Sequence, residues 1–271
     1  MSILTHRGAV EAQTTRDNGA LPVTVVISAR NEAANIAECI ASVPWASEVL
    51  VIENGSTDDT VRIARDAGAR VISNQRFISV EDQRNQAIAQ VATEWILVLD
   101  ADERATPGVE EAIRELLRGS PAFEAYRIRR ISYFLGKLIR YGGWERDRPV
   151  RLFRRHLRYT LMSPHGHVDV RRPGVLGGRL IHYPYPDLAS YFEKLTRYSA
   201  VWATHHFAEG RRTSVGNVIV RPPLRFLTMY IWRRGFLDGA HGAIVAALAS
   251  VSVAAKYARL WELTLQERRG R

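Results

Sequence analysis

The sequence predicts an α/β fold: a mostly parallel sheet flanked by helices, followed by a C-terminal helical appendage. Three observations lead to this prediction. Strand-like and helix-like segments alternate four times between residues 22 and 120, which is typical of a parallel sheet covered by helices. The strand-like segments are continuous runs of branched apolar residues, as expected of strands buried on both faces. Beyond residue 216, arginines alternate with aromatic and apolar residues, which indicates basic, apolar helices outside the strand–helix alternation.

The first two strands are predicted at residues 23–27 and 48–52, which are rich in β-branched residues. Apolar residues then fall at helical spacing from residue 33 until Pro44 ends the pattern. After the second strand, the turn-forming residues 53–60 lead into a helix that ends at Gly68.

The third strand is predicted at residues 70–73, and Ser79 with Asp82 resembles a capping box for the helix behind it. The fourth strand is the apolar run 95–99, and Thr106 with Pro107 marks the start of the next helix. Further strands are expected at 126–133 and 150–153, separated by a Gly- and Arg-rich functional loop at 135–149, and a helix at 187–208. The expected organisation is a flexible tail at 1–21, two halves of one domain at 22–120 and 121–215, and a basic, apolar helical tail at 216–271.

The composition restricts the possible partners. A net charge of +10 implies partners that carry negative charge. The only cysteine, Cys39, excludes an intramolecular disulfide. The sequence contains neither G-x-G-x-x-G nor a P-loop motif, which argues against a dinucleotide enzyme or a P-loop NTPase.

Two aspartates, Asp100 and Asp102, directly follow the fourth strand. Residues at positions i and i+2 of a strand project to one side, and the carboxyl ends of strands in open α/β sheets bind ligands. Two neighbouring carboxylates repel each other unless a cation or a proton joins them, so Mg²⁺ or Mn²⁺ holding a diphosphate fits this place. From these residues alone, two solvated aspartates that cap the next helix remain an alternative.

The residues after the first strand and those of the C-terminal tail each allow two interpretations. Ser28 or Asn31 would cap the following helix, or this helix start would hold an anionic group beside Arg30. In the tail, the apolar run 243–255 spans about 20 Å as a helix, which is short of a bilayer core. No apolar run reaches 18 residues, so no clear transmembrane helix is predicted. An in-plane membrane anchor and an ordinary pair of packed helices both fit the tail.

Taken together, four segments in this order resemble the family 2 glycosyltransferases of the GT-A fold, whose sheet is Rossmann-like: VVISARNE (25–32), NGSTD (54–58), QRNQA (83–87) and DADE (100–103). Further segments are similar to the bacterial lipopolysaccharide core β-1,4-glucosyltransferase branch: FLGK (134–137), GGW (142–144), RLFR (151–154), KLTRYS (194–199) and GFLDG (235–239). The resemblance covers roughly residues 22 to 262.

The resemblance implies a role for individual residues. Asp100 and Asp102 would hold the nucleotide-sugar and its divalent metal, Mg²⁺ or Mn²⁺. Glu53 stands where the family usually has an aspartate that meets the uracil or ribose, and Asp58 would be structural. The other residues implied in substrate binding are Ser28, Arg30, Glu32, Arg84 and Trp144.

An inverting transfer also needs a carboxylate base on the far side of the sugar. Asp147 is the first choice for this base, with Asp169 and Glu145 in reserve. Related enzymes often have a His-Glu pair near His165, but here Gly166 follows the histidine. Contact of His165 with the metal or diphosphate and a purely structural histidine both stay open.

The resemblance therefore implies an inverting, metal-dependent hexosyltransferase that uses a nucleotide-sugar, UDP-glucose or similar. Its acceptor would be a lipopolysaccharide-core or other lipid-linked saccharide, and it would lie on an anionic membrane surface, peripheral on the cytoplasmic face of the bacterial inner membrane. No nucleic acid is expected as a partner. The alternatives are a sugar-1-phosphate nucleotidyltransferase and a non-catalytic basic membrane- or nucleic-acid-binding protein with a relic GT-A domain.

Overall fold

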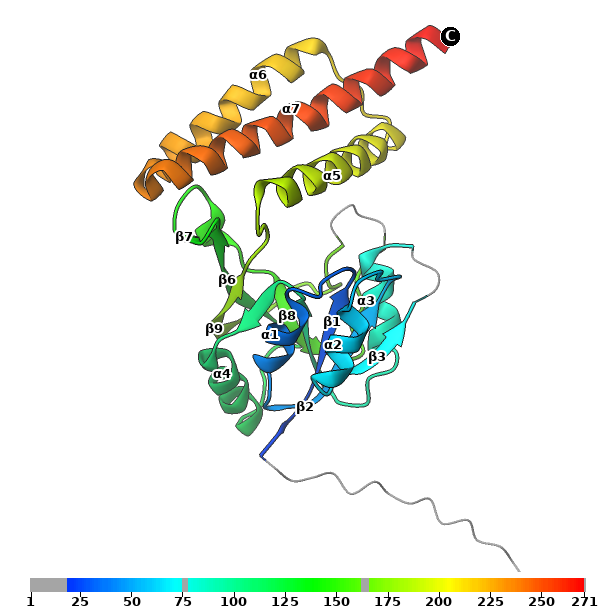
Figure 1. Cartoon of the computed structure of the whole chain (residues 1–271), viewed down its shortest axis with the longest axis vertical. Helices are drawn as coiled ribbons and strands as arrows, with labels where there is room; N and C mark the ends of the chain where they lie inside the picture. Colours follow the sequence, from blue (N-terminus) through cyan, green and yellow to red (C-terminus); the bar gives the residue numbers. More distant parts are fainter. Residues whose placement is uncertain (1–18, 75–77, 162–165, 271) are drawn as a thin grey trace, which may run out of the picture.

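The computed structural model describes residues 19–74, 78–161 and 166–270, so most of the predicted N-terminal tail lies outside the described residues. Four parallel strands form the first part of the sheet, in the order β3-β2-β1-β4 (Figure 1). These strands are β1 (Leu21–Ala29), β2 (Ala46–Glu53), β3 (Arg70–Ser73) and β4 (Trp95–Asp100). Each of them contains the run of apolar residues that predicts it.

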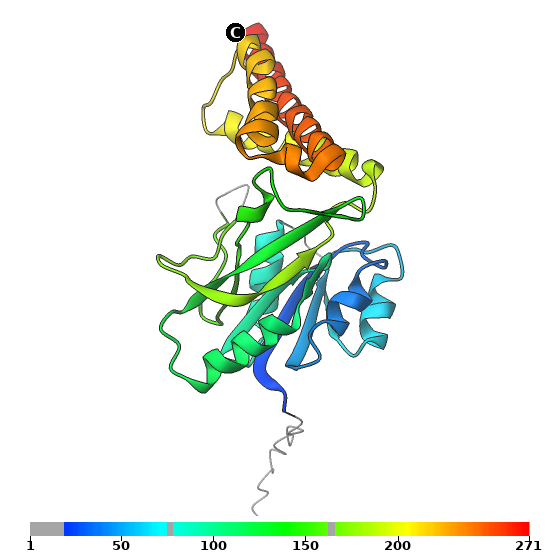
Figure 2. The ribbon, with the colours of Figure 1, turned by 90° about the vertical axis from the view of Figure 1, so that its left-hand side faces the viewer.

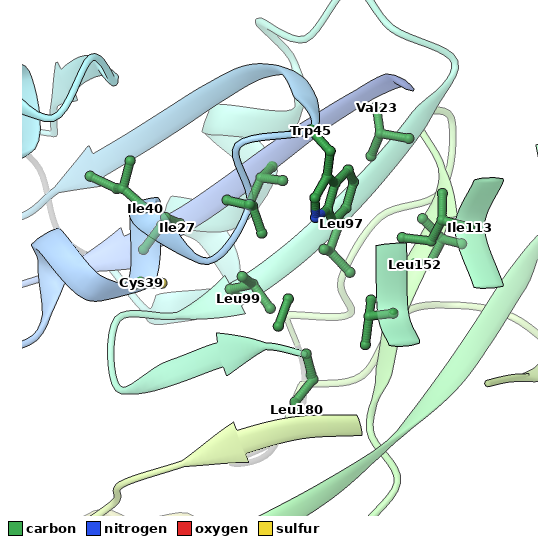
Figure 3. Packing of buried hydrophobic residues seen from close by; sticks show 14 of the residues in the cluster. Val23, Ile27, Cys39, Ile40, Trp45, Leu97, Leu99, Ile113, Leu152 and Leu180 are labelled. Atoms are coloured by element: carbon green, nitrogen blue, oxygen red, sulfur yellow. The ribbon is translucent and has the colours of Figure 1, made fainter. Parts of the chain in front are cut away.

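Helices α1 (Ile36–Ala41), α2 (Thr60–Asp66), α3 (Val80–Ile88) and α4 (Pro107–Arg118) connect and follow these strands. Side chains alternate across each strand, so α1, α2 and α4 share one apolar layer with Ile27, whereas α3 packs on the opposite face with Val26. Figure 3 shows Ile27 and Leu99 beside the fully buried Cys39 of α1. The predicted α/β fold is confirmed.

Beyond β4 the sheet continues through β8 (Val150–Arg154), β6 (Ala125–Phe134), β9 (Gly174–His182) and β5 (Glu103–Ala105), with β7 (Lys137–Ile139) paired to β6. This part mixes parallel and antiparallel pairs, since β8 runs antiparallel to both β4 and β6 while β9 runs parallel to β6. Strands β5 and β9 are absent from the sequence prediction, and β7 lies within residues 135–149, which were predicted to form a loop. Gly178 is one reason why β9 is not predicted. A Cβ at this position would lie 2.5 Å from the backbone of Gly108, so the close crossing of β9 over α4 requires glycine. Glycine weakens the strand pattern in the sequence.

The C-terminal part consists of α5 (Leu188–Ala208), α6 (Val215–Leu227), a π-helical turn (Thr228–Trp232), a 3-10 turn (Gly235–Asp238) and α7 (Gly239–Gly270). Helices α6 and α7 lie side by side at one end of the molecule, with α5 between them and the sheet (Figures 1 and 2). The Tyr191 hydroxyl of α5 donates to the Leu248 carbonyl of α7 at 2.7 Å, which fixes the two helices together.

One helical segment, Gly235–Arg269, is long and apolar enough to cross a membrane by length and composition, with a mean hydropathy of 1.5 over 18 residues. The prediction of no clear transmembrane helix stays a prediction. The prediction relied on an uninterrupted apolar run, whereas the helix continues past the run on both sides. The finding concerns length and composition only.

The carboxylate of Asp238, which is buried, joins the C-terminal helices to the loop at 135–149. It accepts hydrogen bonds from the backbone N–H groups of Arg140 at 3.1 Å and Tyr141 at 2.8 Å. Lys137 donates to the Asp238 carbonyl at 2.8 Å. The loop that the sequence marks as functional is therefore held in place by the appendage.

Candidate active site

The carboxyl ends of β1 and β4 form the base of the site. Ser28 and Asp100 are direct neighbours in the register of these two strands. The Ser28 hydroxyl is buried and has no hydrogen-bond partner among the described residues. An unsatisfied buried hydroxyl at this edge of a sheet suits contact with a polar ligand.

Arginines from three elements surround the Asp100 carboxylate. Arg84 of α3 pairs with one oxygen, and Arg151 of β8 pairs with the other at 2.5 Å. Arg130 of β6 lies 3.7 Å from the second oxygen. Burial by itself raises the pKa of Asp100, but the guanidinium groups of Arg151, Arg84 and Arg130 outweigh it and hold the pKa far below its usual range. Asp100 is therefore an ionised anchor for these arginines.

Glu103 completes this network below the surface. Its side chain is fully buried and accepts hydrogen bonds from Arg151 at 2.7 Å and Arg130 at 2.9 Å. Its second oxygen accepts the backbone N–H of Asp100 at 3.1 Å. Glu103 therefore holds Arg130 and Arg151 in place, and these arginines in turn hold the Asp100 carboxylate.

Asp102 has a different environment. Burial, followed by repulsion from Asp100 and Glu103, raises the pKa of Asp102 to about 7. The His182 Nε2 lies 3.6 Å from the Asp102 carboxylate, and the Lys194 ammonium lies 3.7 Å from it. A second cation at this carboxylate would offset the repulsion from its acidic neighbours.

His182 is a site residue that the sequence reasoning missed. It ends β9, and its Nδ1 lies 3.0 Å from the Ser132 hydroxyl, which fixes the orientation of the ring. Burial, and then the charge of Arg130, lowers the pKa of His182 to about 3, so the imidazole is neutral. A neutral imidazole with its second nitrogen anchored is the form that binds metals. No local sequence pattern marks His182, because only the pairing of β9 with β5 carries it to Asp102.

The residues around Asp102 determine whether a divalent cation fits this site. Among the residues that the structure describes, no three His, Cys, Asp or Glu side chains converge as a metal cluster. Asp102 and His182 offer one carboxylate and one neutral imidazole. Mg²⁺ or Mn²⁺ held by two protein groups takes its remaining ligands from water and substrate phosphates, so this pair fits a metal that arrives with a diphosphate.

Asp147 lines a cavity of about 430 Å³ that is also lined by Trp144, His182 and Tyr185. Arg130 donates from Nε to the Asp147 carboxylate at 2.7 Å, so the same arginine contacts Glu103 and Asp147. The Asp147 side chain remains 38% exposed, which leaves it accessible to a substrate. The structure thus brings Asp147 and Trp144 together with His182.

The two reserve carboxylates, Glu145 and Asp169, are not among the residues that line this cavity. Glu145 accepts the backbone N–H of Gly143 at 2.8 Å and stabilises its own turn. Asp169 is exposed and follows the bridge between Tyr159 and Val168, outside the lining of the cavity. His165 lies outside the described residues.

The expected nucleotide-binding residues occupy the ends of β1 and β2. Glu32 accepts a hydrogen bond from the Asn35 side chain at 2.8 Å, and Glu53 accepts the backbone N–H of Ser56 at 3.0 Å. Arg30 is exposed, whereas Arg84 is turned toward Asp100. Asp58 accepts the backbone N–H groups of Ala33 and Thr60, which is the structural role expected for it.

Comparison with known proteins gives consistent matches. The sequence model described as Glycosyl transferase family 2 matches residues 24–176. The lipopolysaccharide core biosynthesis glycosyltransferase LpsC of Rhizobium meliloti is 27% identical over 253 residues, covering 88% of this chain and 94% of that protein. An uncharacterised glycosyltransferase of Rickettsia typhi is 28% identical over 265 residues, covering 91% of this chain and 89% of its own length.

Among solved structures, glucosyl-3-phosphoglycerate synthase of Mycobacterium tuberculosis matches with a TM-score of 0.39 and 20% identity, over 49% of this chain and 57% of that chain. The family assignment depends on the sequence match, which spans more than half of the chain. The chain belongs to glycosyl transferase family 2 and is a glycosyltransferase.

Proposed function

We propose that this glycosyltransferase is inverting and metal-dependent, and that it moves a hexose from a nucleotide-sugar, UDP-glucose or similar, to a lipopolysaccharide-core or other lipid-linked saccharide. One observation carries the proposal. The cavity at the carboxyl edge of the sheet contains an accessible carboxylate, Asp147, together with His182, whose ring lies against Asp102. A candidate base and a histidine that contacts Asp102 therefore line the same cavity.

On the donor side, Asp102 and His182 are the groups that would hold the divalent cation. When bound, such a cation supplies charge neutralisation to the leaving diphosphate. The metal was expected at Asp100 as well, but both oxygens of Asp100 already pair with arginines. We therefore assign Asp100 to organising the arginines beside the nucleotide. Ser28, Arg30, Glu32 and Glu53 are the candidate contacts of the nucleoside.

On the acceptor side, Asp147 is the proposed base. The acceptor hydroxyl attacks the anomeric carbon from the face opposite the nucleotide and passes its proton to the Asp147 carboxylate. The electron pair of the breaking C–O bond leaves with the nucleoside diphosphate. Arg130 orients Asp147 through the 2.7 Å hydrogen bond, and Trp144 supplies an apolar wall for a sugar ring. The acceptor class follows the name of LpsC, to which the chain is similar over most of its length.

The donor assignment is tested by measuring the thermal unfolding of the protein with each of a panel of nucleotide-sugars, in the presence and absence of Mn²⁺. A UDP-sugar should raise the unfolding temperature in Mn²⁺, because a ligand bound only to the folded state stabilises it, and EDTA should remove the effect. Stabilisation that is equal in Mn²⁺ and in EDTA would contradict metal-dependent binding. Release of pyrophosphate from a nucleoside triphosphate would instead favour the nucleotidyltransferase alternative.

The outer surface of the C-terminal helices supports membrane association. Val220, Leu224, Leu227 and Ile231 recur at helical spacing and are exposed, and Trp232 beside them is 85% exposed. Arginines 221, 225, 233 and 234 interleave with them. An exposed apolar stripe among basic residues suits a helix lying in the interface of an anionic membrane. Because α6 and α7 lie side by side across one end of the molecule (Figure 1), we propose peripheral attachment to the cytoplasmic face of the inner membrane.

Replacing Leu224 and Ile231 together with aspartate is expected to weaken sedimentation with phosphatidylethanolamine–phosphatidylglycerol vesicles by about tenfold or more, because two exposed apolar contacts are lost. The matched control is Val175→Asp, which changes an exposed valine of β9 on the sheet and should leave vesicle binding unchanged. Equal vesicle binding by the double variant and the wild-type protein would refute the in-plane attachment through α6.

A further inference from the structure

A second cavity, of about 350 Å³, lies between the sheet domain and the C-terminal helices. Its apolar wall is formed by Phe134 of β6, by Met229 of the π-helical turn and by Val245 and Leu248 of α7. Phe134, Met229 and Val245 are buried and pack against one another. The wall therefore offers a hydrocarbon surface that the fold does not fill.

Trp144 and Tyr185 line this second cavity and also the active-site cavity that contains Asp147. Both rings pack edge-on against Phe134, with ring centroids 6.4 Å apart in each pair. The two spaces are therefore neighbours that share an aromatic wall. A molecule whose one end occupies the second cavity can place its other end beside Asp147.

Two cations, Arg225 of α6 and Lys256 of α7, also line the second cavity. Among the described residues neither forms an ion pair with a carboxylate, and the Lys256 ammonium lies over the Trp202 ring, 5.8 Å from its centroid. Burial, and then the charge of Arg233, lowers the pKa of Arg225, while burial and Arg225 lower the pKa of Lys256. Half-buried cations without a counterion are costly, and an anion bound between them would remove that cost.

We propose that the second cavity binds a phosphate group attached to an apolar chain, with the phosphate between Arg225 and Lys256 and the chain against Phe134, Met229 and Val245. This inference rests on the proposed function and makes it more specific. The acceptor is then a lipid-phosphate-linked saccharide, whose sugar reaches Asp147 past the shared wall of Trp144 and Tyr185. Helix α6 carries the exposed apolar stripe and also contributes Arg225 to the cavity, which suits entry from a membrane surface.

The proposal is tested by calorimetric titration of the full chain with dodecyl phosphate below its micellar concentration, in the absence of donor and metal. Binding of one molecule per chain is expected. Dodecyl maltoside, which has the same chain without a charge, and inorganic phosphate, which has the charge without a chain, should each bind at least about tenfold more weakly.

Arg225→Gln combined with Lys256→Gln should weaken dodecyl phosphate binding by about tenfold or more, because charge-assisted hydrogen bonds are lost. The matched control, Arg221→Gln, changes an arginine one turn away that bonds Asn217 and does not line the cavity, and it should bind normally. If thermal unfolding shows that the double variant is not folded, each single variant is titrated with the same expectation.

Equal affinity for dodecyl maltoside, or unchanged binding by the charge variants, would overturn the proposal. Binding of inorganic phosphate as tight as that of dodecyl phosphate would overturn the lipid part in favour of a soluble phosphorylated sugar. Because the titration contains no donor, its failure is distinguishable from failure of the donor panel, which reports on nucleotide-sugar binding alone.

Discussion

Asp102→Asn is expected to weaken Mn²⁺-dependent binding of the UDP-sugar by at least about 10- to 100-fold, the loss typical of a residue that only supports a metal ligand. The physical reason is specific to this residue. Asp102 lies 3.6 Å from a neutral, anchored imidazole and is repelled by two acidic neighbours, so it is the carboxylate that gains most from a cation. Calorimetric titration of the UDP-sugar in Mn²⁺ measures the change.

The matched control for this variant is Asp66→Asn, an exposed aspartate of α2 that pairs with Arg62. It should bind the donor normally. Asp100→Asn should also weaken donor binding, but with a loss of thermal stability, because Arg84 loses its carboxylate partner and the buried Arg151 keeps only Glu103. If Asp102→Asn and Asp100→Asn together leave affinity and turnover unchanged, the assignment of the donor site is wrong.

Asp147→Asn is expected to lower kcat by about 10²- to 10⁴-fold, the usual contribution of a general base, with donor affinity almost unchanged. Asparagine keeps the shape and one acceptor oxygen for Arg130 but takes no proton from the acceptor. Steady-state transfer assays, together with donor titration of the same variant, separate the two effects.

Glu145→Gln and Asp169→Asn serve as comparisons, since both residues were candidates for the base. Glu145 bonds within its own turn and Asp169 lies outside the cavity, so each variant should retain most of the transfer rate. Full activity of Asp147→Asn, with activity lost in either comparison variant, would move the base to that residue.

The first half of the fold was predictable because its signals are local. Each strand from β1 to β4 is a continuous apolar run, and each following helix begins at a recognisable turn or cap, such as Ser79, whose hydroxyl accepts the Asp82 N–H at 3.1 Å. Strand β9 was not predictable in the same way. Its glycines suppress the strand pattern, although Gly178 is required by the crossing over α4.

The same difference between local and long-range signals applies to the residues of the site. Asp100, Asp102 and Ser28 follow directly from strand ends, so the sequence indicates them. The pairing of Arg151 with Glu103, and of His182 with Asp102, joins residues that lie 48 or more positions apart. Such contacts depend on the mixed part of the sheet, for which the sequence has no local pattern. The sequence pattern gives Asp100 and Asp102 the same role, whereas in the structure Asp100 pairs with arginines and Asp102 lies beside His182.

Electron paramagnetic resonance of Mn²⁺ tests the central claim most directly, because free hexaaqua Mn²⁺ gives a strong signal that falls when the ion is bound. The account predicts that the wild-type chain with UDP removes one Mn²⁺ per chain from the free signal, and that Asp102→Asn and His182→Ala each abolish this. A free Mn²⁺ signal that UDP leaves unchanged, or binding that survives in both variants, would contradict a donor site built on Asp102 and His182.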